Sequence, residues 1–327
     1  MDNRNIKDDA EEKDSRTLEL LKIRSVSADI RDGIRLYLNN FRSIFRSSWL
    51  AALFYALVTG GMMTYCIGNV TNLLKMQMEG HLTEDNNELM LLGAGFAVCM
   101  LLAIIASTLL YSSGLSLLSR HSETGAIPTP AHWYGSNDKR TILRTSLWML
   151  ATVVIIAVYE AIIFAIKKWL TGVLSPMSLT ILIGITTIIM LIALPIIMMR
   201  MLPYILNKDN KSPMGYGIPV RTWGSTLTIA IVVMIMIGIA SIVTTLPSLI
   251  LLAANIQSLG GTIYGDPTGM PSYMIWMNMG VFTLAGFIQA YVNLSSLFPF
   301  YYLYGSIETQ KKERKDYNEI YEKDSIY

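Results

Sequence analysis

The chain has 327 residues, of which 52% are hydrophobic and only 15% are charged, and its formal net charge is +2. Together with a positive mean hydropathy, this composition departs from that of soluble globular domains in the direction of membrane proteins. It excludes an ordinary soluble domain.

Residues 1–26 predict a disordered tail, because the first 24 residues mix six basic with seven acidic side chains and contain few apolar ones. From residue 27 to residue 48 the pattern is that of an amphipathic helix lying on the membrane surface. Four arginines form a narrow stripe that we expect to contact lipid phosphates, and the alternative is that they only anchor the topology. The apolar side comprises Ile30, Ile34, Tyr37, Leu38, Phe41, Ile44 and Phe45, and the stripe comprises Arg31, Arg35, Arg42 and Arg46.

Six long apolar stretches follow, and each is long enough to cross a hydrocarbon core of about 30 Å, which needs about 20 helical residues. They lie at 49–70, 89–118, 146–166, 177–204, 226–254 and 273–303. The predicted fold class is therefore an all-α polytopic membrane bundle with six transmembrane helices in a domain at 49–305. Residues 306–327 are predicted to form a cytoplasmic tail.

The basic residues predict the sidedness of this domain. If the chain is divided at the six stretches, 23 of its 26 lysines and arginines fall in the compartment that holds both termini. Short loops rich in Lys and Arg stay in the cytoplasm, so both termini are expected there, in the inner membrane of a bacterial host. Membrane lipids are the expected partners, with another membrane or cytoplasmic protein as a further one. Topology accounts for the basic residues, so no nucleic-acid partner is expected.

A heptapeptide recurs before two of the predicted spans. Arg42-Ser-Ile-Phe-Arg46-Ser-Ser48 resembles Arg140-Thr-Ile-Leu-Arg144-Thr-Ser146, and a degenerate form begins at Arg221. One interpretation is three helical-hairpin repeats, each with a basic entry segment. The other is that every helix start at the inner leaflet attracts Arg, Ser and Trp for interfacial reasons. Arg140 and Arg144 are accordingly further candidates for headgroup contact.

Polar residues inside the predicted spans are the main functional candidates. Glu160 lies within the third span, where a carboxylate is costly unless it is neutralised or paired. On the sixth helix, Asn278, Gln289, Asn293 and Ser296 fall within about 80° of arc and form a polar stripe. We expect this cluster either to handle an ion or proton or to join helices by amide hydrogen bonds. Asn278 has a depth similar to that of Glu160, so a contact between the two is one expectation.

The sequence shows no phosphate-binding glycine loop, nucleophile elbow or metal-ligand spacing, so we expect neither an enzyme nor a bound cofactor. Cys66 and Cys99 lie inside spans and are interpreted as small core residues. Two functional interpretations remain. The first is a scaffold, assembly or envelope-maintenance factor, and the alternative is a small transporter or channel that uses Glu160 and the polar stripe.

The segment Leu36-Tyr-Leu-Asn-Asn-Phe-Arg-Ser-Ile-Phe-Arg-Ser-Ser-Trp49 feeds an amphipathic helix into the first of six spans. In this it resembles uncharacterised bacterial six-span inner-membrane proteins and, more distantly, the membrane domain attached to some glycerophosphodiester phosphodiesterases. The resemblance implies a helical membrane bundle. It implies no catalytic residues, because the soluble catalytic domain of those phosphodiesterases has no counterpart here.

Overall fold

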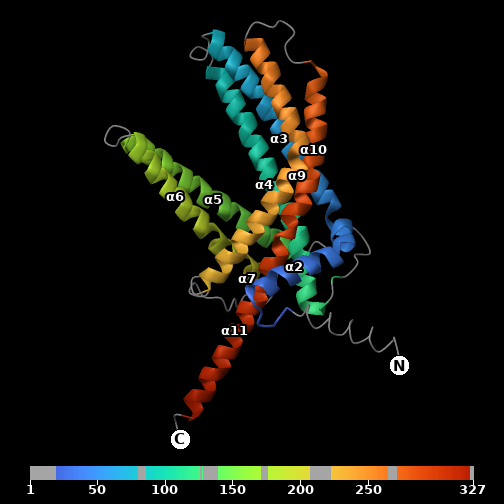
Figure 1. Cartoon of the computed structure of the whole chain (residues 1–327), viewed down its shortest axis with the longest axis vertical. Coiled ribbons are helices and arrows are strands. Elements are labelled where there is room, and N and C mark those ends of the chain that lie inside the picture. Colours follow the sequence, from blue (N-terminus) through green and yellow to red (C-terminus); the bar gives the residue numbers. More distant parts are fainter. Residues whose placement is uncertain are drawn as a thin grey trace. The chain divides into compact units, whose positions relative to one another are not determined.

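A computed structural model describes residues 20–79, 86–125, 127, 139–170, 176–206, 222–263 and 271–324 of the chain. All the regular structure in these residues is helical (Figure 1). The helices are α2 (Val26–Asn39), α3 (Phe41–Glu79), α4 (Asn86–Thr124), α5 (Lys139–Leu170), α6 (Pro176–Met198), α7 (Met201–Leu206), α9 (Trp223–Ile263), α10 (Tyr273–Ser295) and α11 (Leu297–Asp324).

Five stretches of helix are long and apolar enough to cross a membrane: Phe41–Asn69, Met90–Thr124, Lys139–Trp169, Trp223–Ser258 and Tyr273–Arg314. The fourth predicted span corresponds to α6, in which the described residues give a shorter apolar stretch, Thr180–Met190. Large apolar side chains are exposed along these helices, for example Ile188, Ile239 and Ile242. Lipid, rather than water, is the solvent that tolerates such surfaces. The chain is therefore a multi-pass membrane protein with an all-α fold.

The amphipathic segment expected at 27–48 consists of two helices. Ser25 caps the start of α2, since its side chain accepts a hydrogen bond from the Ala28 amide at 3.4 Å. Asn40 ends it by donating from Nδ2 to the Leu36 carbonyl at 3.0 Å. The Asn40 carbonyl then accepts bonds from the amides of Ser43 and Ile44. One asparagine therefore closes α2 and opens α3, which continues into the first span.

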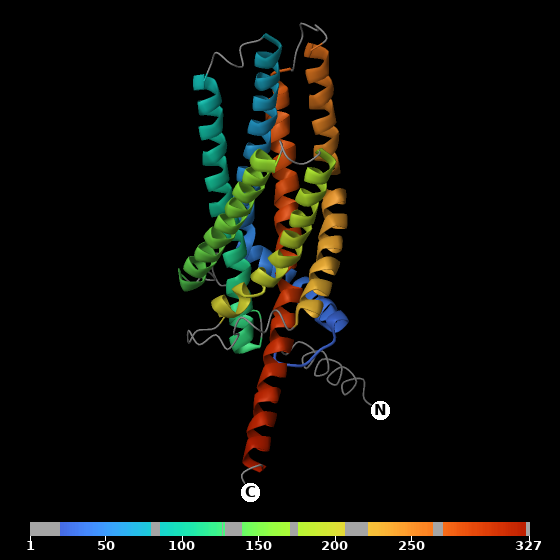
Figure 2. The ribbon, with the colours of Figure 1, turned by 90° about the vertical axis from the view of Figure 1, so that its left-hand side faces the viewer.

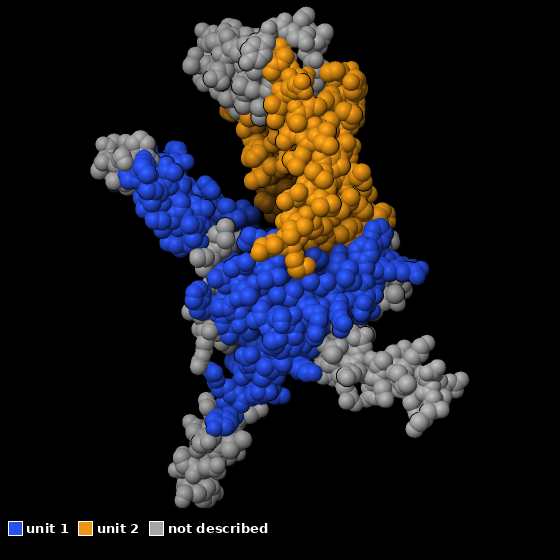
Figure 3. All heavy atoms as spheres, in the orientation of Figure 1, with its two compact units in different colours: residues 1–46, 114–234, 295–327 blue, residues 47–113, 235–294 orange. Residues whose placement is uncertain are grey.

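The chain forms two compact units (Figure 3). Unit 1 comprises residues 1–46, 114–234 and 295–327, and unit 2 comprises residues 47–113 and 235–294. The membrane domain expected at 49–305 is thus divided between both units. The expected tail at 306–327 begins inside α11, whose residues 301–307 are all buried.

Unit 1 contains α2, α5, α6, α7 and α11. Helix α2 lies against α11, while α5, α6 and α7 contact one another. Fully buried aromatic and aliphatic side chains fill the space around α11, because that helix begins with an aromatic-rich run. They include Leu36, Phe298, Tyr301 and Tyr302.

Unit 2 is a bundle of the long parts of α3, α4, α9 and α10, which run alongside one another (Figure 2). Its core contains Ala52, Leu110, Ala290 and Tyr291. Small residues let α3 and α10 approach closely, as is common in membrane bundles. A Cβ added to Gly60 would lie 2.8 Å from the backbone nitrogen of Thr283.

The two recurring heptapeptides occupy equivalent places. Residues 42–48 lie in the first two turns of α3, and residues 140–146 lie in the first two turns of α5. The degenerate third copy begins at Arg221, outside the described residues. The threefold repeat stays a prediction.

Candidate functional site

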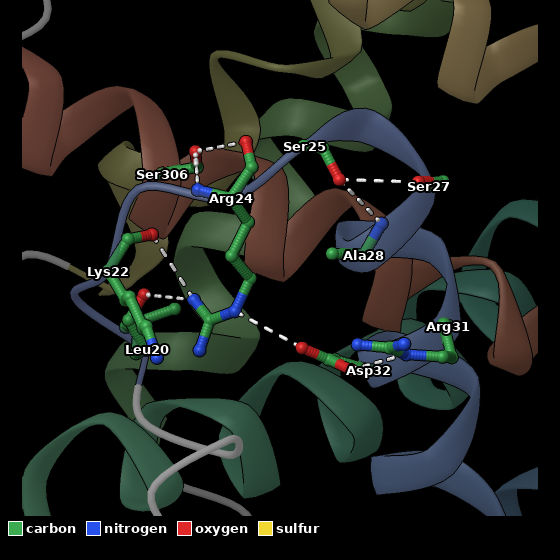
Figure 4. A network of polar contacts seen from close by, with 9 residues as sticks. All are labelled: Leu20, Lys22, Arg24, Ser25, Ser27, Ala28, Arg31, Asp32 and Ser306. Carbon is green, nitrogen blue, oxygen red and sulfur yellow. Dashed lines mark hydrogen bonds and ion pairs between the residues drawn. The ribbon is translucent and has the colours of Figure 1, made fainter.

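A buried set of contacts, which we name the clasp, links Arg24, just before α2, both to α2 and to α11 (Figure 4). Arg24 donates from Nε to Asp32 Oδ2 at 3.3 Å, and the two side chains are only 4% and 5% exposed. The Arg24 guanidinium also lies over the Tyr302 ring, 4.8 Å from its centroid. The Arg24 amide donates to Ser306 Oγ at 3.1 Å. Asp32 Oδ1 also accepts a hydrogen bond from Nε of the exposed Arg31 at 3.2 Å. The ion pair ties Arg24 to α2, and the ring contact and the amide hydrogen bond tie Arg24 to α11. Through Arg24, the clasp therefore fixes the start of α2 on α11.

Asp29, the last member of the clasp, lies one turn before Asp32 and is 1% exposed. Its Oδ1 accepts no hydrogen bond from the residues that the structure describes. Burial raises the pKa of Asp29 from 3.8 to about 7; the nearby Arg24 charge opposes this rise and the Asp32 charge adds to it. The proton on this carboxyl is therefore exchanged near neutral pH.

Beside the clasp, the backbones of α2 and α11 touch. A Cβ added to Gly33 would lie 2.6 Å from the Pro299 nitrogen and 2.8 Å from the Phe298 carbonyl carbon. Only glycine permits this approach. Next to it, the rings of Tyr37 and Phe298 meet edge to face with centroids 5.1 Å apart.

The docking of α2 differs from the sequence prediction. The buried side consists of Asp29, Asp32, Gly33, Leu36 and Tyr37. The apolar positions predicted to face the headgroup region are divided: Leu38, Phe41 and Phe45 are exposed, whereas Tyr37 and Ile44 are buried. A tertiary partner, α11, decides which side of α2 is buried.

The predicted headgroup arginines divide into two groups. Arg31, Arg35, Arg42 and Arg46 are all exposed along α2 and the first turns of α3. Arg144, in contrast, is partly buried and engaged within unit 1. Its guanidinium donates to the Tyr204 carbonyl and stacks on the Tyr204 ring at 5.0 Å. Arg140, also partly buried, lies one turn before it on α5.

The polar stripe predicted on the sixth helix lies on α10 and pairs with α9 in unit 2. Asn255 and Asn278 exchange two amide hydrogen bonds, at 2.8 and 3.1 Å, and are both 2% exposed. Gln289 donates to Ser241 Oγ at 2.8 Å and to Asn293 Oδ1 at 3.0 Å. We name this set of residues, together with Thr244, which donates to Gln289 at 3.4 Å, the polar seam. Its groups bind one another, as in interhelical contacts that hold membrane helices together.

Glu160 lies on α5 in unit 1 and is exposed, whereas Asn278, Gln289 and Asn293 lie in unit 2. The observed partner of Asn278 is Asn255, a residue that the sequence analysis did not select. A sequence signal was present, because Ser241, Thr244, Ser248 and Asn255 are separated by three, four and seven residues and therefore share one side of the otherwise apolar α9.

The clasp residues were also missed. Arg24 falls in the segment expected to be a disordered tail, and its contact with Ser306 joins residues 282 positions apart. Asp29 and Asp32 share one side of a helix with Leu36, which is the available sequence signal. In the described residues, no group of three or more His, Cys, Asp and Glu side chains is arranged to hold a metal ion.

Comparison of the chain with protein-family models, with curated proteins and with solved structures gives no match.

Proposed function

We propose that this multi-pass membrane protein is a non-catalytic scaffold that serves as an assembly or envelope-maintenance factor in the bacterial inner membrane. The observation that carries the proposal is the clasp. It fixes a short helix, α2, against the buried part of α11. Arg24 pairs with Asp32 of α2 and contacts Tyr302 and Ser306 of α11, and the two backbones approach closely at Gly33.

The contacts of the clasp are typical of a structural role rather than of a catalytic or transport cycle. Buried ion pairs contribute little net stability compared with apolar packing, and their best-attested use is to specify one arrangement. The Arg24 guanidinium donates hydrogen bonds to Asp32 and to the carbonyls of Leu20 and Lys22, all within its own unit. Such a group holds α2 and α11 in one arrangement, as expected of a structural contact.

The polar seam supports the same proposal. Its amides and hydroxyls bind one another between α9 and α10, so their role is to join two helices. A transporter would use the same groups differently, as ligands for a moving solute.

The sidedness proposed for the scaffold rests on the distribution of Lys and Arg, which favours a cytoplasmic location for both termini. The clasp and α2 would then face the cytoplasm. The proposed protein partner is accordingly a cytoplasmic protein or a membrane protein with a cytoplasmic surface.

The test is native mass spectrometry of the full chain extracted from its own membranes in a mild detergent. We expect the wild type to leave the membrane in an assembly larger than one chain. Arg24→Gln should release the lone chain, and Lys312→Gln, which removes an exposed cation on α11, should not.

A second measurement separates the scaffold from the alternative transporter. Proteoliposomes containing the purified chain are assayed for proton and sodium flux with fluorescent indicators. The proposal predicts no flux above that of empty vesicles. A flux that is abolished by Glu160→Gln but kept by Glu313→Gln would overturn it in favour of transport.

A further inference from the structure

The charged residues of α2 and the start of α3 are sorted by sign. Both acidic side chains, Asp29 and Asp32, are buried at 1% and 3% exposure. All four arginines are exposed. We name the resulting surface the basic face, which comprises Arg31, Arg35, Leu38, Phe41, Arg42, Phe45 and Arg46. Arg31 is paired through Nε with Asp32 Oδ1 at 3.2 Å. Because the docking of α2 on α11 buries both carboxylates, the exposed charged groups of this surface are all basic.

Large apolar side chains are interleaved with these arginines. Leu38 is 62% exposed, and Phe41 and Phe45 are each 41% exposed. A line of ring contacts connects them to the interior. The Tyr37 ring lies 5.8 Å from that of Phe41, which in turn lies 6.2 Å from that of Phe45. Since Tyr37 packs on the buried Phe298, the exposed rings are held by the core.

The position of the basic face along the chain identifies its surroundings. The first span begins at Phe41, so Arg42 and Arg46 lie in the first two turns of a membrane-crossing helix. Side chains at that place meet the lipid headgroups. Guanidinium groups bind phosphate through paired hydrogen bonds, and aromatic rings favour the headgroup region.

We infer that the basic face is a binding surface for anionic phospholipid, with Arg35, Arg42 and Arg46 on the phosphates and Leu38, Phe41 and Phe45 inserted among the upper acyl chains. The clasp presents this surface by holding both carboxylates of α2 away from the lipid. The inference goes beyond the proposed scaffold and does not depend on it, because a protein that assembles with nothing else can still select lipid.

The test uses the full chain in nanodiscs that contain phosphatidylcholine with a minor fraction of phosphatidylglycerol. Spin-labelled forms of the two lipids report the relative association constants at the protein surface. The variant Arg42→Gln/Arg46→Gln removes two exposed cations from the basic face. The matched control, Lys312→Gln/Arg314→Gln, removes two exposed cations from α11.

We expect the wild type and the control to prefer phosphatidylglycerol, and the Arg42→Gln/Arg46→Gln variant to lose that preference by at least about fivefold. Raising the salt to about 1 M should reduce the wild-type preference in the same way, because screening shortens the range of the charges. Equal preference in wild type and variant would overturn the inference. An equal loss in the control would also overturn it, since net charge rather than the basic face would then select the lipid.

A second readout guards against indirect effects of the arginine changes. A nitroxide attached through Leu38→Cys, in a background with Cys66→Ala and Cys99→Ala, is probed with oxygen and with a water-soluble nickel chelate. We expect it to be shielded from the chelate in nanodiscs that contain phosphatidylglycerol. Full access to the chelate in those nanodiscs would show that the face binds something other than lipid, such as an acidic protein segment, and would refute the inference.

Discussion

Replacement of Gly33 by alanine tests the contact between α2 and α11 at its closest point. The new methyl group would lie 2.6 Å from the Pro299 nitrogen and 2.8 Å from both Phe298 C and Pro299 Cα. All three atoms belong to the backbone, so no side chain can rotate away. Ordinary van der Waals contact begins at 3.4 Å. To restore it, the distance between the helices must grow by about 0.8 Å, and each helix moves by several tenths of an ångström if both share the shift.

The expected magnitude follows from two opposing effects. Overpacking a well-packed contact costs about 1–3 kcal/mol. Alanine in a helix interior recovers about 0.5–1 kcal/mol relative to glycine. The net expectation is that docking of α2 is weakened by about 1–2 kcal/mol, which corresponds to amide exchange about 5- to 30-fold faster in residues 26–39.

Hydrogen exchange with mass spectrometry on the full chain in nanodiscs measures this effect. The control is Gly224→Ala near the start of α9, where an added Cβ meets nothing within 4 Å. Exchange in residues 26–39 that is equally slow in Gly33→Ala, Gly224→Ala and the wild type would refute the proposed contact.

Three further predictions concern the clasp and the polar seam. The docked Asp29 keeps its proton up to a pH of about 7, whereas a released Asp29 loses it near 3.8, so the docked state binds the extra proton and docking should weaken as pH rises between these values. The full change in docking free energy is on the order of 4 kcal/mol. Amide exchange in residues 26–39, corrected for the intrinsic effect of pH, should report this change, and Asp29→Asn should abolish it. Docking that does not depend on pH in the wild type would contradict the prediction. In the polar seam, Asn255→Ala and Asn278→Ala should each lower the free energy of unfolding in detergent by about 1–3 kcal/mol, because the remaining amide loses its interhelical partner. The coupling energy in the double-mutant cycle should be about 0.6 kcal/mol. Strictly additive losses would argue against the pair. Gln289→Leu should cost about 1–3 kcal/mol in the same assay, since it removes the donor to Ser241 Oγ, while Thr244 keeps its bond to the Ser241 carbonyl. A variant as stable as the wild type would show that the Ser241 hydroxyl finds another partner.

The membrane-spanning helices could be predicted from the sequence because the bilayer sets a minimum apolar length. The fourth span shows where this rule loses resolution. The predicted stretch at 177–204 is interrupted at Met199 and Arg200, between α6 and α7. Pro203 lies inside α7, and a proline in a helix removes the hydrogen bond to the carbonyl four residues before it, here that of Met199, which favours such an interruption. Hydropathy alone does not register it.

The polar stripe on α10 was predictable and its partner was not. Helical periodicity placed Asn278, Gln289 and Asn293 on one side of the helix. Which neighbour meets that side depends on packing, and α9 supplies Asn255 and Ser241. Glu160 was predicted to be a functional residue because a buried carboxylate would be costly. Its side chain is exposed.

The clasp depended on information that periodicity does not carry. An Arg and two Asp residues near the N-terminus have the composition of a solvated surface. Arg24 is buried because Ser306 and Tyr302, at the other end of the chain, provide the hydrogen bond and the ring that replace water. Asp32 is buried as the ionic partner of Arg24, and Asp29 is buried on the side of α2 that docks on α11. Only the tertiary fold brings these groups together.

The measurement that tests the central claim most directly is the distance between α2 and α11 in the full chain. Spin labels are introduced through Leu38→Cys and Lys312→Cys, with Cys66 and Cys99 replaced by alanine, and are measured by double electron–electron resonance in nanodiscs. A clasped α2 predicts a single narrow distance distribution that broadens in Arg24→Gln. A broad distance distribution in the labelled protein with Arg24 intact, or a narrow one that Arg24→Gln leaves unchanged, would contradict the docking of α2 on α11.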